Sequence, residues 1–422
     1  MSPNRAAVPE GVVHSAKVLR VLAVALVAGL VLSCVWQLVD GATISDGGGC
    51  ATIDGRNYCA MAKGRVAQEP FARRVLVPAI VRILPIGSLA DRFRAVDIVA
   101  IILMVIAGAV VIRRGAVALG ADPRRAHWAA IGGGALVGML PHATRLGLSV
   151  PVLTDFAAMG LAMLWFALFT TRSRIAQWVS VPVAAMTVLT REQWALPIVA
   201  IGIVATVWPA IVRRRVGVAS VAAVLVALGV AFSQPTHGAY ASGLGAFGNQ
   251  IKASILTPHG WLMYLVNVLF AIGFVPAAWF VIARPIITRL PGRPEAALVV
   301  GGALVVGLVQ LPLTVFSGYD IARIAANAAG FLIVATFAAV AYAGCDVLLV
   351  ALAAGSVLFW RPWITLSGPM NHYLQLYVPQ ATPHGVRNAA IWVAGSAAIC
   401  LIVSVGVRSL NPELRAIAHP RP

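Results

Sequence analysis

Long apolar runs separated by short polar or basic segments make up most of this chain. A run of about 20 residues, or somewhat fewer where Pro or Gly ends a helix, is long enough to cross a bilayer as an α-helix. The pattern therefore predicts an all-α polytopic membrane protein, with about 12 transmembrane helices in one transmembrane domain over residues 1–422. The expected spans are 18–39, 95–112, 128–141, 154–170, 177–190, 194–212, 216–233, 261–283, 296–316, 325–343, 347–360 and 388–407.

The composition supports a membrane location. Hydrophobic residues account for 60% of the chain and charged residues for 11%, and the mean hydropathy is +0.89. A soluble domain typically carries about 25% charged residues. The formal net charge of +18 comes from short basic clusters between the spans, a distribution that orients helices in a membrane. We therefore expect contact with membrane lipids and no binding to nucleic acid.

The basic residues also predict an orientation. If the N-terminus is inside, 18 of the 32 Lys and Arg residues fall on inner segments and 14 on outer segments. Eight of those 14 belong to one long outer segment, 40–94, and long translocated loops escape the positive-inside rule. The short loops therefore place both termini in the cytoplasm, which predicts a multi-pass protein of the cell membrane.

The segment 40–94 is expected to be the first extracytoplasmic loop. Its portion 70–84, PFARRVLVPAIVRIL, alternates basic and apolar residues as a short interfacial helix does. Cys50 and Cys59 lie in the same loop, nine residues apart. In an oxidising compartment this spacing permits a disulfide around Asp54, and two free thiols are the alternative.

Charged residues border or interrupt several apolar spans at their expected outer ends. An ionised side chain at membrane depth costs at least about 2.5–3.5 kcal/mol, so it is kept where it has a partner or a wet cavity. A helix cap, or an ion pair that only fixes a corner, would also explain each residue taken singly. Because all of them map to the outer face, we expect them to meet near Asp54. They are Asp155 in PVLTDFAAMG, Arg191 and Glu192 in VLTREQWALP, and Asp320 and Arg323 in GYDIARIA.

The loop carries a resemblance to a known family. DGRNYCAMAKGRVAQEPFARRVLVPAI is similar to the first outer loop of bacterial membrane glycosyltransferases of the GT-C type, D-x-x-x-Y-x-x-x-A followed by P-F-x-x-R-x-L-x-P. TDFAAMGLA, LTREQWALPIVA and GYDIAR resemble later segments of the same proteins, in the same order. The resemblance covers scattered pieces from residue 54 to about 325, and Arg73 departs from it where an aromatic residue is frequent. The loop pattern is filled by Asp54, Tyr58, Ala62, Pro70, Phe71, Arg74, Leu76 and Pro78.

The resemblance implies a GT-C-like fold and a polyprenyl-phosphate-sugar-dependent, mannosyltransferase-like activity. Such an enzyme moves a sugar from a polyprenyl-phosphate donor to a glycan, lipid or protein acceptor at the extracytoplasmic face, with inversion. The catalytic acid of the family carries over to Asp54. A divalent cation, Mg²⁺ or Mn²⁺, suits oxygen-only ligands, and the sequence leaves metal dependence open. The expected substrate-binding residues are Tyr58, Arg73, Arg74, Asp155, Arg191, Glu192, Asp320 and Arg323.

Two functions without transferase activity remain as alternatives. About twelve spans with both ends inside would also suit a secondary transporter, whose binding charges are expected near the middle of the membrane. Here the expected sixth and seventh spans are joined by little more than Arg213, Arg214 and Arg215, and the charges gather at one face. The other alternative is a lipid-handling or scaffold membrane protein.

Overall fold

A computed structural model describes residues 10–39, 50, 53–67, 71–207, 217–232, 258–314, 321–363 and 385–410. Helix accounts for 87% of this described structure, which contains no strand. The prediction of an all-α protein is therefore confirmed.

Helices of the first half of the chain, with short 3-10 or π turns labelled η, follow one another closely. They are α1 (Glu10–Val39), α2 (Ile53–Ala62), η1 (Phe71–Arg73), α3 (Leu76–Ile83), α4 (Leu89–Leu119), α5 (Pro123–Gly138), η2 (His142–Leu146), α6 (Gly147–Ser149), α7 (Asp155–Phe169), α8 (Arg174–Thr190), η3 (Glu192–Trp194), α9 (Ala195–Val207) and α11 (Gly217–Phe232).

The second half contains α13 (Pro258–Ile272), η4 (Val275–Ala278), α14 (Trp279–Ile287), η5 (Leu290–Gly292), α15 (Pro294–Ala296), η6 (Ala297–Gly301), α16 (Gly302–Leu313), α17 (Ile321–Ala343), α18 (Asp346–Trp360) and α20 (Gly385–Leu410).

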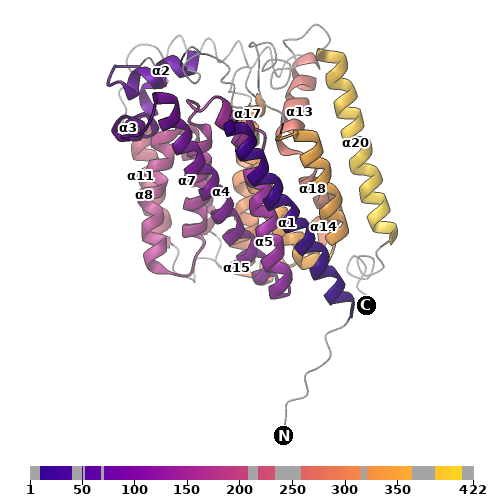
Figure 1. Cartoon of the computed structure of the whole chain (residues 1–422). Helices are drawn as coiled ribbons and strands as arrows, with labels where there is room; N and C mark the ends of the chain where they lie inside the picture. The colour runs from indigo at the N-terminus through magenta and orange to yellow at the C-terminus, as the bar shows by residue number, and fades with distance from the viewer. Residues whose placement is uncertain are drawn as a thin grey trace.

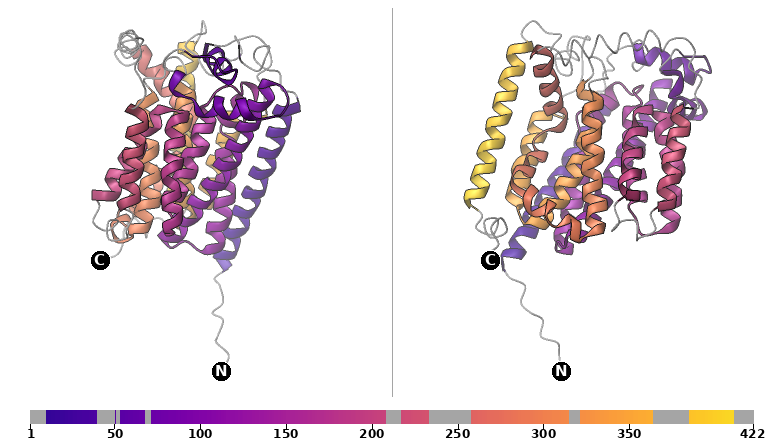
Figure 2. Two further views of the ribbon diagram at one scale, coloured as in Figure 1. Left: turned by 90° about the vertical axis from the view of Figure 1, so that its left-hand side faces the viewer. Right: turned by 180° about the vertical axis from the view of Figure 1, so that it is seen from behind.

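The long helices stand side by side in one bundle, with α2 and α3 lying across its upper end (Figure 1). The helix α1 begins and α20 ends on the lower side of the same view. Two further views show the same arrangement, with α20 at the outer edge next to α13 (Figure 2). The centre of the bundle is α17, which packs against α4, α5, α13 and α16.

Four helical stretches in the described residues are long and apolar enough to cross a membrane. They are Ala16–Val39, Leu89–Leu119, Pro294–Leu313 and Ala322–Ala343. A bent pair, Gly260–Ile272 with Val275–Ile287, makes a fifth if it counts as one span, and several shorter apolar helices stand beside them. This fits a membrane protein, while the count of about twelve spans and the GT-C fold stay predictions. The expected span 261–283 is not one straight helix, because the chain turns by 91° within it.

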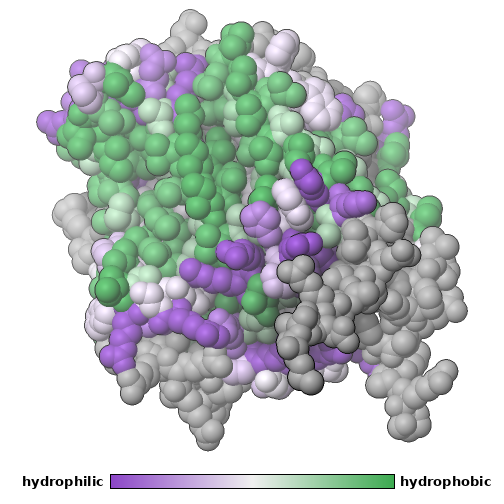
Figure 3. Space-filling view, turned by 60° about the horizontal axis from the view of Figure 1, so that its bottom comes forward, coloured by the Kyte–Doolittle hydropathy of each residue, from purple (hydrophilic) through white to green (hydrophobic). Residues whose placement is uncertain are grey.

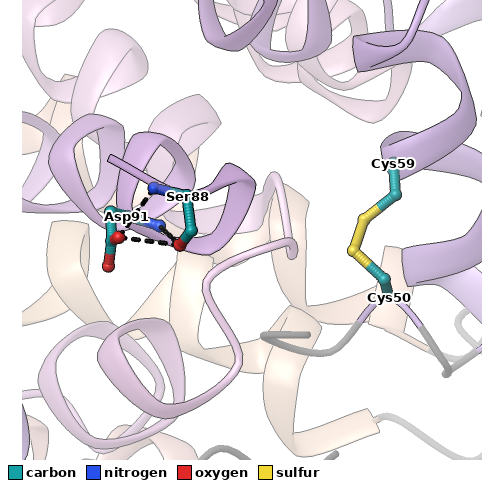
Figure 4. Close-up of a disulfide and its surroundings, with 4 residues drawn as sticks. All are labelled: Cys50, Cys59, Ser88 and Asp91. Atoms are coloured by element: carbon teal, nitrogen blue, oxygen red, sulfur yellow. Dashed lines mark hydrogen bonds between the residues drawn. A yellow bond between two sulfur atoms is a disulfide. The ribbon is translucent and has the colours of Figure 1, made fainter. Parts of the chain in front are cut away.

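Local sequence signals set the ends of α4 and α5. Ser88 caps α4: its hydroxyl accepts from the Asp91 amide, and the Asp91 carboxylate accepts from the Ser88 amide at 2.9 Å (Figure 4). Gly120 ends α4 with φ +94°, a backbone conformation that favours glycine. Asp122 then caps α5, which starts at Pro123. The cap of Ser88 and Asp91 fixes the start of α4 shortly after α3, at the upper end of the bundle.

The surface divides into an apolar belt and polar ends. In a view that brings the lower end forward, a broad hydrophobic band covers the sides of the helices and hydrophilic side chains gather below it (Figure 3). Such a belt is what lipid acyl chains contact in a helical membrane protein. The surface therefore agrees with the hydropathy of the sequence.

Candidate functional site

Asp54 meets Arg323 at the upper end of the bundle. Asp54 lies in the first turn of α2, and Arg323 lies in the first turn of α17, 269 residues later in the chain. The Nη2 group of Arg323 donates to Oδ2 of Asp54 at 3.0 Å. The Asp54 side chain is 23% exposed and the Arg323 side chain 8%. Of this pair, the carboxylate is thus the group that solvent or a substrate reaches.

Asp155 lies beneath this pair and connects two arginines. It is the first residue of α7, and its side chain is 2% exposed. Oδ2 stands 3.4 Å from Nε of Arg323, and Oδ1 forms an ion pair with Nη1 of Arg191. A negative charge is also favoured at this position because it faces the N-terminal end of the helix dipole. Asp155 therefore places one negative charge between two buried guanidinium groups.

A second ion pair joins Arg74 to Glu192. Arg74 follows η1 in the first loop, and its Nε and Nη2 groups donate to the two carboxylate oxygens of Glu192 at 3.0 and 2.7 Å. Nη1 of Arg74 donates to the hydroxyl of Tyr58 at 2.9 Å, and that hydroxyl shares a 3.3 Å hydrogen bond with Thr154. This two-pronged geometry fixes the guanidinium plane. The loop is thereby tied to the start of α7 and to η3.

The break between α8 and η3 separates the neighbours Arg191 and Glu192. Arg191 follows the last residue of α8 in an extended conformation, with φ −158° and ψ 114°. In a continuous helix, successive side chains point about 100° apart around one axis. The extended backbone of Arg191 instead changes the direction of the chain between the two residues. As a result Arg191 pairs with Asp155, and Glu192 pairs with Arg74. The two residues do not form the internal pair considered as an alternative.

Cys50 and Cys59 form a disulfide with a Cα–Cα distance of 5.8 Å (Figure 4). Of the two possibilities left open by the sequence, the structure has the bridge. It closes a loop over a sequence separation of nine residues, with Asp54 inside it. Cys59 itself is 4% exposed and belongs to the core beside Tyr58. The bridge therefore restrains the N-terminal end of α2, where Asp54 lies.

Arginine charges control the ionisation of Asp54. Burial acts to raise the pKa of its carboxyl group, but the charges of Arg323, Arg191 and Arg74 and the hydrogen bond from Arg323 lower that pKa below its ordinary value. Asp54 is therefore an ionised carboxylate at neutral pH. The acids Asp54, Asp155 and Glu192 and the bases Arg74, Arg191 and Arg323 balance in formal charge.

The structure adds residues that the sequence reasoning missed. His142 and Arg145 lie in the π-helical turn η2, and each is 1% exposed. Burial, followed by the charges of Arg323 and Arg145, lowers the pKa of His142 to about 3, so the imidazole is neutral at pH 7. Asp97 in α4 is 2% exposed and interacts electrostatically with Asp155. The sequence signal for His142 and Arg145 was the polar string HATR directly after a predicted apolar span. In addition, π-helical turns are frequent at functional sites.

Two expected site residues cannot be placed. Asp320 lies outside the described residues, and so does the side chain of Arg73. Six others belong to a charged network around Asp54 that has two sets of contacts. Asp54, Arg323, Asp155 and Arg191 form one set, and Tyr58, Arg74 and Glu192 form the other. The charge of Arg74 acts on Asp54 and on Arg191 across the two sets. In the part of the chain that the structure describes, no group of three or more His, Cys, Asp or Glu residues could hold a metal ion. The possible divalent cation thus gains no ligand set from these residues.

Comparisons of the chain with protein-family models, curated proteins and solved structures give no match. The resemblance to GT-C glycosyltransferases rests on the sequence motifs, and the activity that it implies stays a prediction.

Proposed function

We propose that this protein is a GT-C-type membrane glycosyltransferase that takes a sugar from a polyprenyl-phosphate donor. The observation that supports this most is the ion pair between Asp54 of the first loop and Arg323 of α17, at the entrance of a buried acid and arginine network. A carboxylate that solvent reaches, backed by guanidinium groups, suits a reaction that moves a proton and releases a phosphate.

The proposed reaction is an inverting displacement. The acceptor hydroxyl oxygen attacks the anomeric carbon of the sugar and forms the new glycosidic bond. The bond from that carbon to the phosphate oxygen breaks, and its electron pair leaves with the polyprenyl phosphate. The hydroxyl proton passes to the carboxylate of Asp54. A phosphate is a good leaving group, so one carboxylate as base suffices, without the second acid that hydrolysis of an ordinary glycoside needs.

The arginines would serve the donor phosphate in unequal ways. Arg323 is the guanidinium nearest to Asp54, so it is the proposed group that stabilises the departing phosphate. Arg191 is held by Asp155 and would act through its charge. Arg74 already has Glu192 and Tyr58 as partners. Its proposed role is to fix the first loop, and it would contact only the edge of the donor. Asp155, Glu192 and Tyr58 are positioning residues in this scheme.

The disulfide and the helix α3 support an extracytoplasmic site. Disulfides persist in oxidising compartments, and the Cys50–Cys59 bridge lies on the same side of the bundle as Asp54. The helix α3 buries Val77, Pro78 and Val81 and leaves Ile83 77% exposed, as a short interfacial helix would. We propose that the network faces outward, that both termini are cytoplasmic and that the donor arrives from the outer leaflet.

A transfer assay tests the proposal. Membranes containing the wild type, Asp54→Asn or the control Asp91→Asn would receive radiolabelled polyprenyl-phosphate mannose, glucose or arabinose. Loss of a general base costs about 10²–10⁴ in rate, so Asp54→Asn should lose the transfer, while the exposed cap Asp91 should tolerate asparagine. Transfer that survives in Asp54→Asn removes Asp54 as the base. Accumulation of the substrate in sealed vesicles without a new glycosidic bond favours a transporter.

A further inference from the structure

At Gly273 the apolar chain turns sharply between α13 and α14. Gly273 has φ +67°, and a Cβ atom there would lie 2.6 Å from Cζ2 of Trp360. Ser356 and Trp360 of α18 complete the break: the Phe274 amide donates to Oγ of Ser356 at 2.8 Å, and Nε1 of Trp360 donates to the carbonyl of Phe270 at 2.9 Å. The break therefore satisfies freed backbone groups and is built into the fold.

The helix α14 runs across the bundle near its lower end. The segment Val275–Ile287, made of η4 and α14, is bent by 91° relative to the segment Gly260–Ile272 of α13. Trp279 at its start donates from Nε1 to Oγ1 of Thr336 at 2.9 Å, and the guanidinium of Arg289, just past its end, lies 5.0 Å from the ring centroid of Tyr342. Thr336 and Tyr342 belong to the last two turns of α17, which ends at Ala343. A helix in this place lies near the plane of the lower membrane surface.

The outward face of α14 mixes apolar and basic side chains. Ile282 and Ile286 are fully buried against the bundle, whereas Phe280 is 71% and Ile287 57% exposed. Phe280, Arg284 and Ile287 follow one another at helical spacing, so they share the exposed face. Such a face suits the boundary between lipid headgroups and acyl chains.

The charge of this segment has one sign. Residues 273–294 contain Arg284, Arg289 and Arg293 and no acid. Arg293 donates to the carbonyl of Ala118 at the end of α4 at 3.3 Å and is thereby held at the lower end. The next acid along the chain, Glu295, is paired with Arg172. Arg284 and Arg289 are exposed residues near the apolar side chains of Phe280 and Ile287, and their positive charges complement an anionic headgroup.

We propose that α14 and η5 form an anionic-phospholipid binding surface at the lower membrane interface. The headgroup phosphate binds between Arg284 and Arg289, and the acyl chains lie against Phe280 and Ile287. The surface is on the opposite end of the bundle from Asp54, so the inference does not depend on the proposed transferase activity.

Native mass spectrometry of the purified protein tests the headgroup part. The affinity for the first bound phosphatidylglycerol, compared with phosphatidylcholine, should fall about fivefold for each arginine removed in Arg284→Gln/Arg289→Gln. Arg284→Lys/Arg289→Lys should retain most of the preference. The matched control, Arg113→Gln/Arg174→Gln, removes two exposed arginines outside α14. An equal loss in the control, or no loss in the first variant, overturns the proposal.

The depth of α14 is tested separately by spin labelling. Cys34, Cys345 and Cys400 would be changed to Ser, and one label attached through Ile287→Cys, or through the exposed control Arg174→Cys. In vesicles of phosphatidylcholine and phosphatidylglycerol in equal parts, the label at position 287 should be reached by oxygen and shielded from a water-soluble nickel complex. Equal access of the nickel complex to both labels contradicts the interfacial placement.

Discussion

Removal of the Asp155 charge should destabilise the protein strongly. Asp155→Asn keeps the size of the side chain and takes away the carboxylate between Arg191 and Arg323. Arg323 keeps Asp54 as a partner. Among the ion pairs of the described residues, Asp155 is the sole acid paired with Arg191. The substitution therefore leaves one buried guanidinium without its ion-pair partner.

The burial of the three groups sets the size of the effect. The exposed fractions of the Asp155, Arg191 and Arg323 side chains are 2%, 6% and 8%. Breaking such a pair by removing one partner costs about 3–5 kcal/mol, because a charge stays buried and uncompensated. The control is Asp91, whose side chain is 50% exposed and pairs with Arg94 at 3.3 Å. An exposed pair contributes about 0–1 kcal/mol, so Asp91→Asn should change little.

Equilibrium unfolding in detergent micelles measures the difference in the free energy of unfolding. We expect Asp155→Asn to lie about 3 kcal/mol below Asp91→Asn. The double variant Asp155→Asn/Arg191→Gln should recover part of the loss, because it removes the uncompensated cation. The reasoning is refuted if Asp155→Asn and Asp91→Asn unfold with the same free energy.

Three further changes test other parts of the structure. Tyr58→Phe removes the acceptor of the Arg74 Nη1 group and should lower the free energy of unfolding by about 1.5–3 kcal/mol in the same assay. An unchanged free energy of unfolding would mean that water replaces the hydroxyl. Because the pKa of Asp54 is below its ordinary value of 3.8, its pair with Arg323 stabilises the fold above that pH and loses this effect as the pH falls through the lowered pKa. The stability gap between the wild type and Asp54→Asn should therefore be constant near pH 7 and shrink under strong acid, and a gap that is independent of pH speaks against the pair. Gly273→Ala should destabilise the protein, because Gly273 has a positive φ and an added Cβ would meet Trp360. Gly229→Ala, in a helix with open space around it, should be neutral or stabilising. Similar effects of the two substitutions would contradict a helix break that is built into the fold.

That these charged residues meet at one site could be predicted from the sequence, because charged side chains at membrane depth need partners. Asp155 and Arg323 stand at the predicted outer ends of apolar runs and Asp54 in the predicted loop on the same side, and the structure joins them. Which acid pairs with which arginine could not be predicted. The pairing of Glu192 with Arg74 depends on the extended backbone of Arg191, a local break that the string LTREQW does not specify.

Two features of the fold escaped sequence reasoning. The run 261–283 has the length and hydropathy of a span, but it is broken at Gly273, and the Phe274 amide freed there is satisfied by Ser356, 82 residues later in the chain. His142 and Arg145 lie between the predicted spans 128–141 and 154–170, yet both side chains are buried, and the charge of Arg323 acts on His142. The length of a hydrophobic run predicts neither a bend within it nor a buried turn beside it.

The packing of α17 bears on the choice between a transferase and a transporter. An alternating-access protein needs a polar path from its site to the opposite side of the membrane. Below Arg323, the most apolar window of α17 is completely buried. Phe331 packs against Phe166 and Trp194, with ring centroids 5.6 and 5.8 Å apart, and further down Phe337 fits so closely beside Gly133 that a Cβ atom there would lie 2.8 Å from its ring. Within the described residues these rings lie in the core between the Asp54 network and the lower end of the bundle. A core packed in this way favours the proposed transferase, whose lipid-linked donor and acceptor would come from the same side, over a transporter.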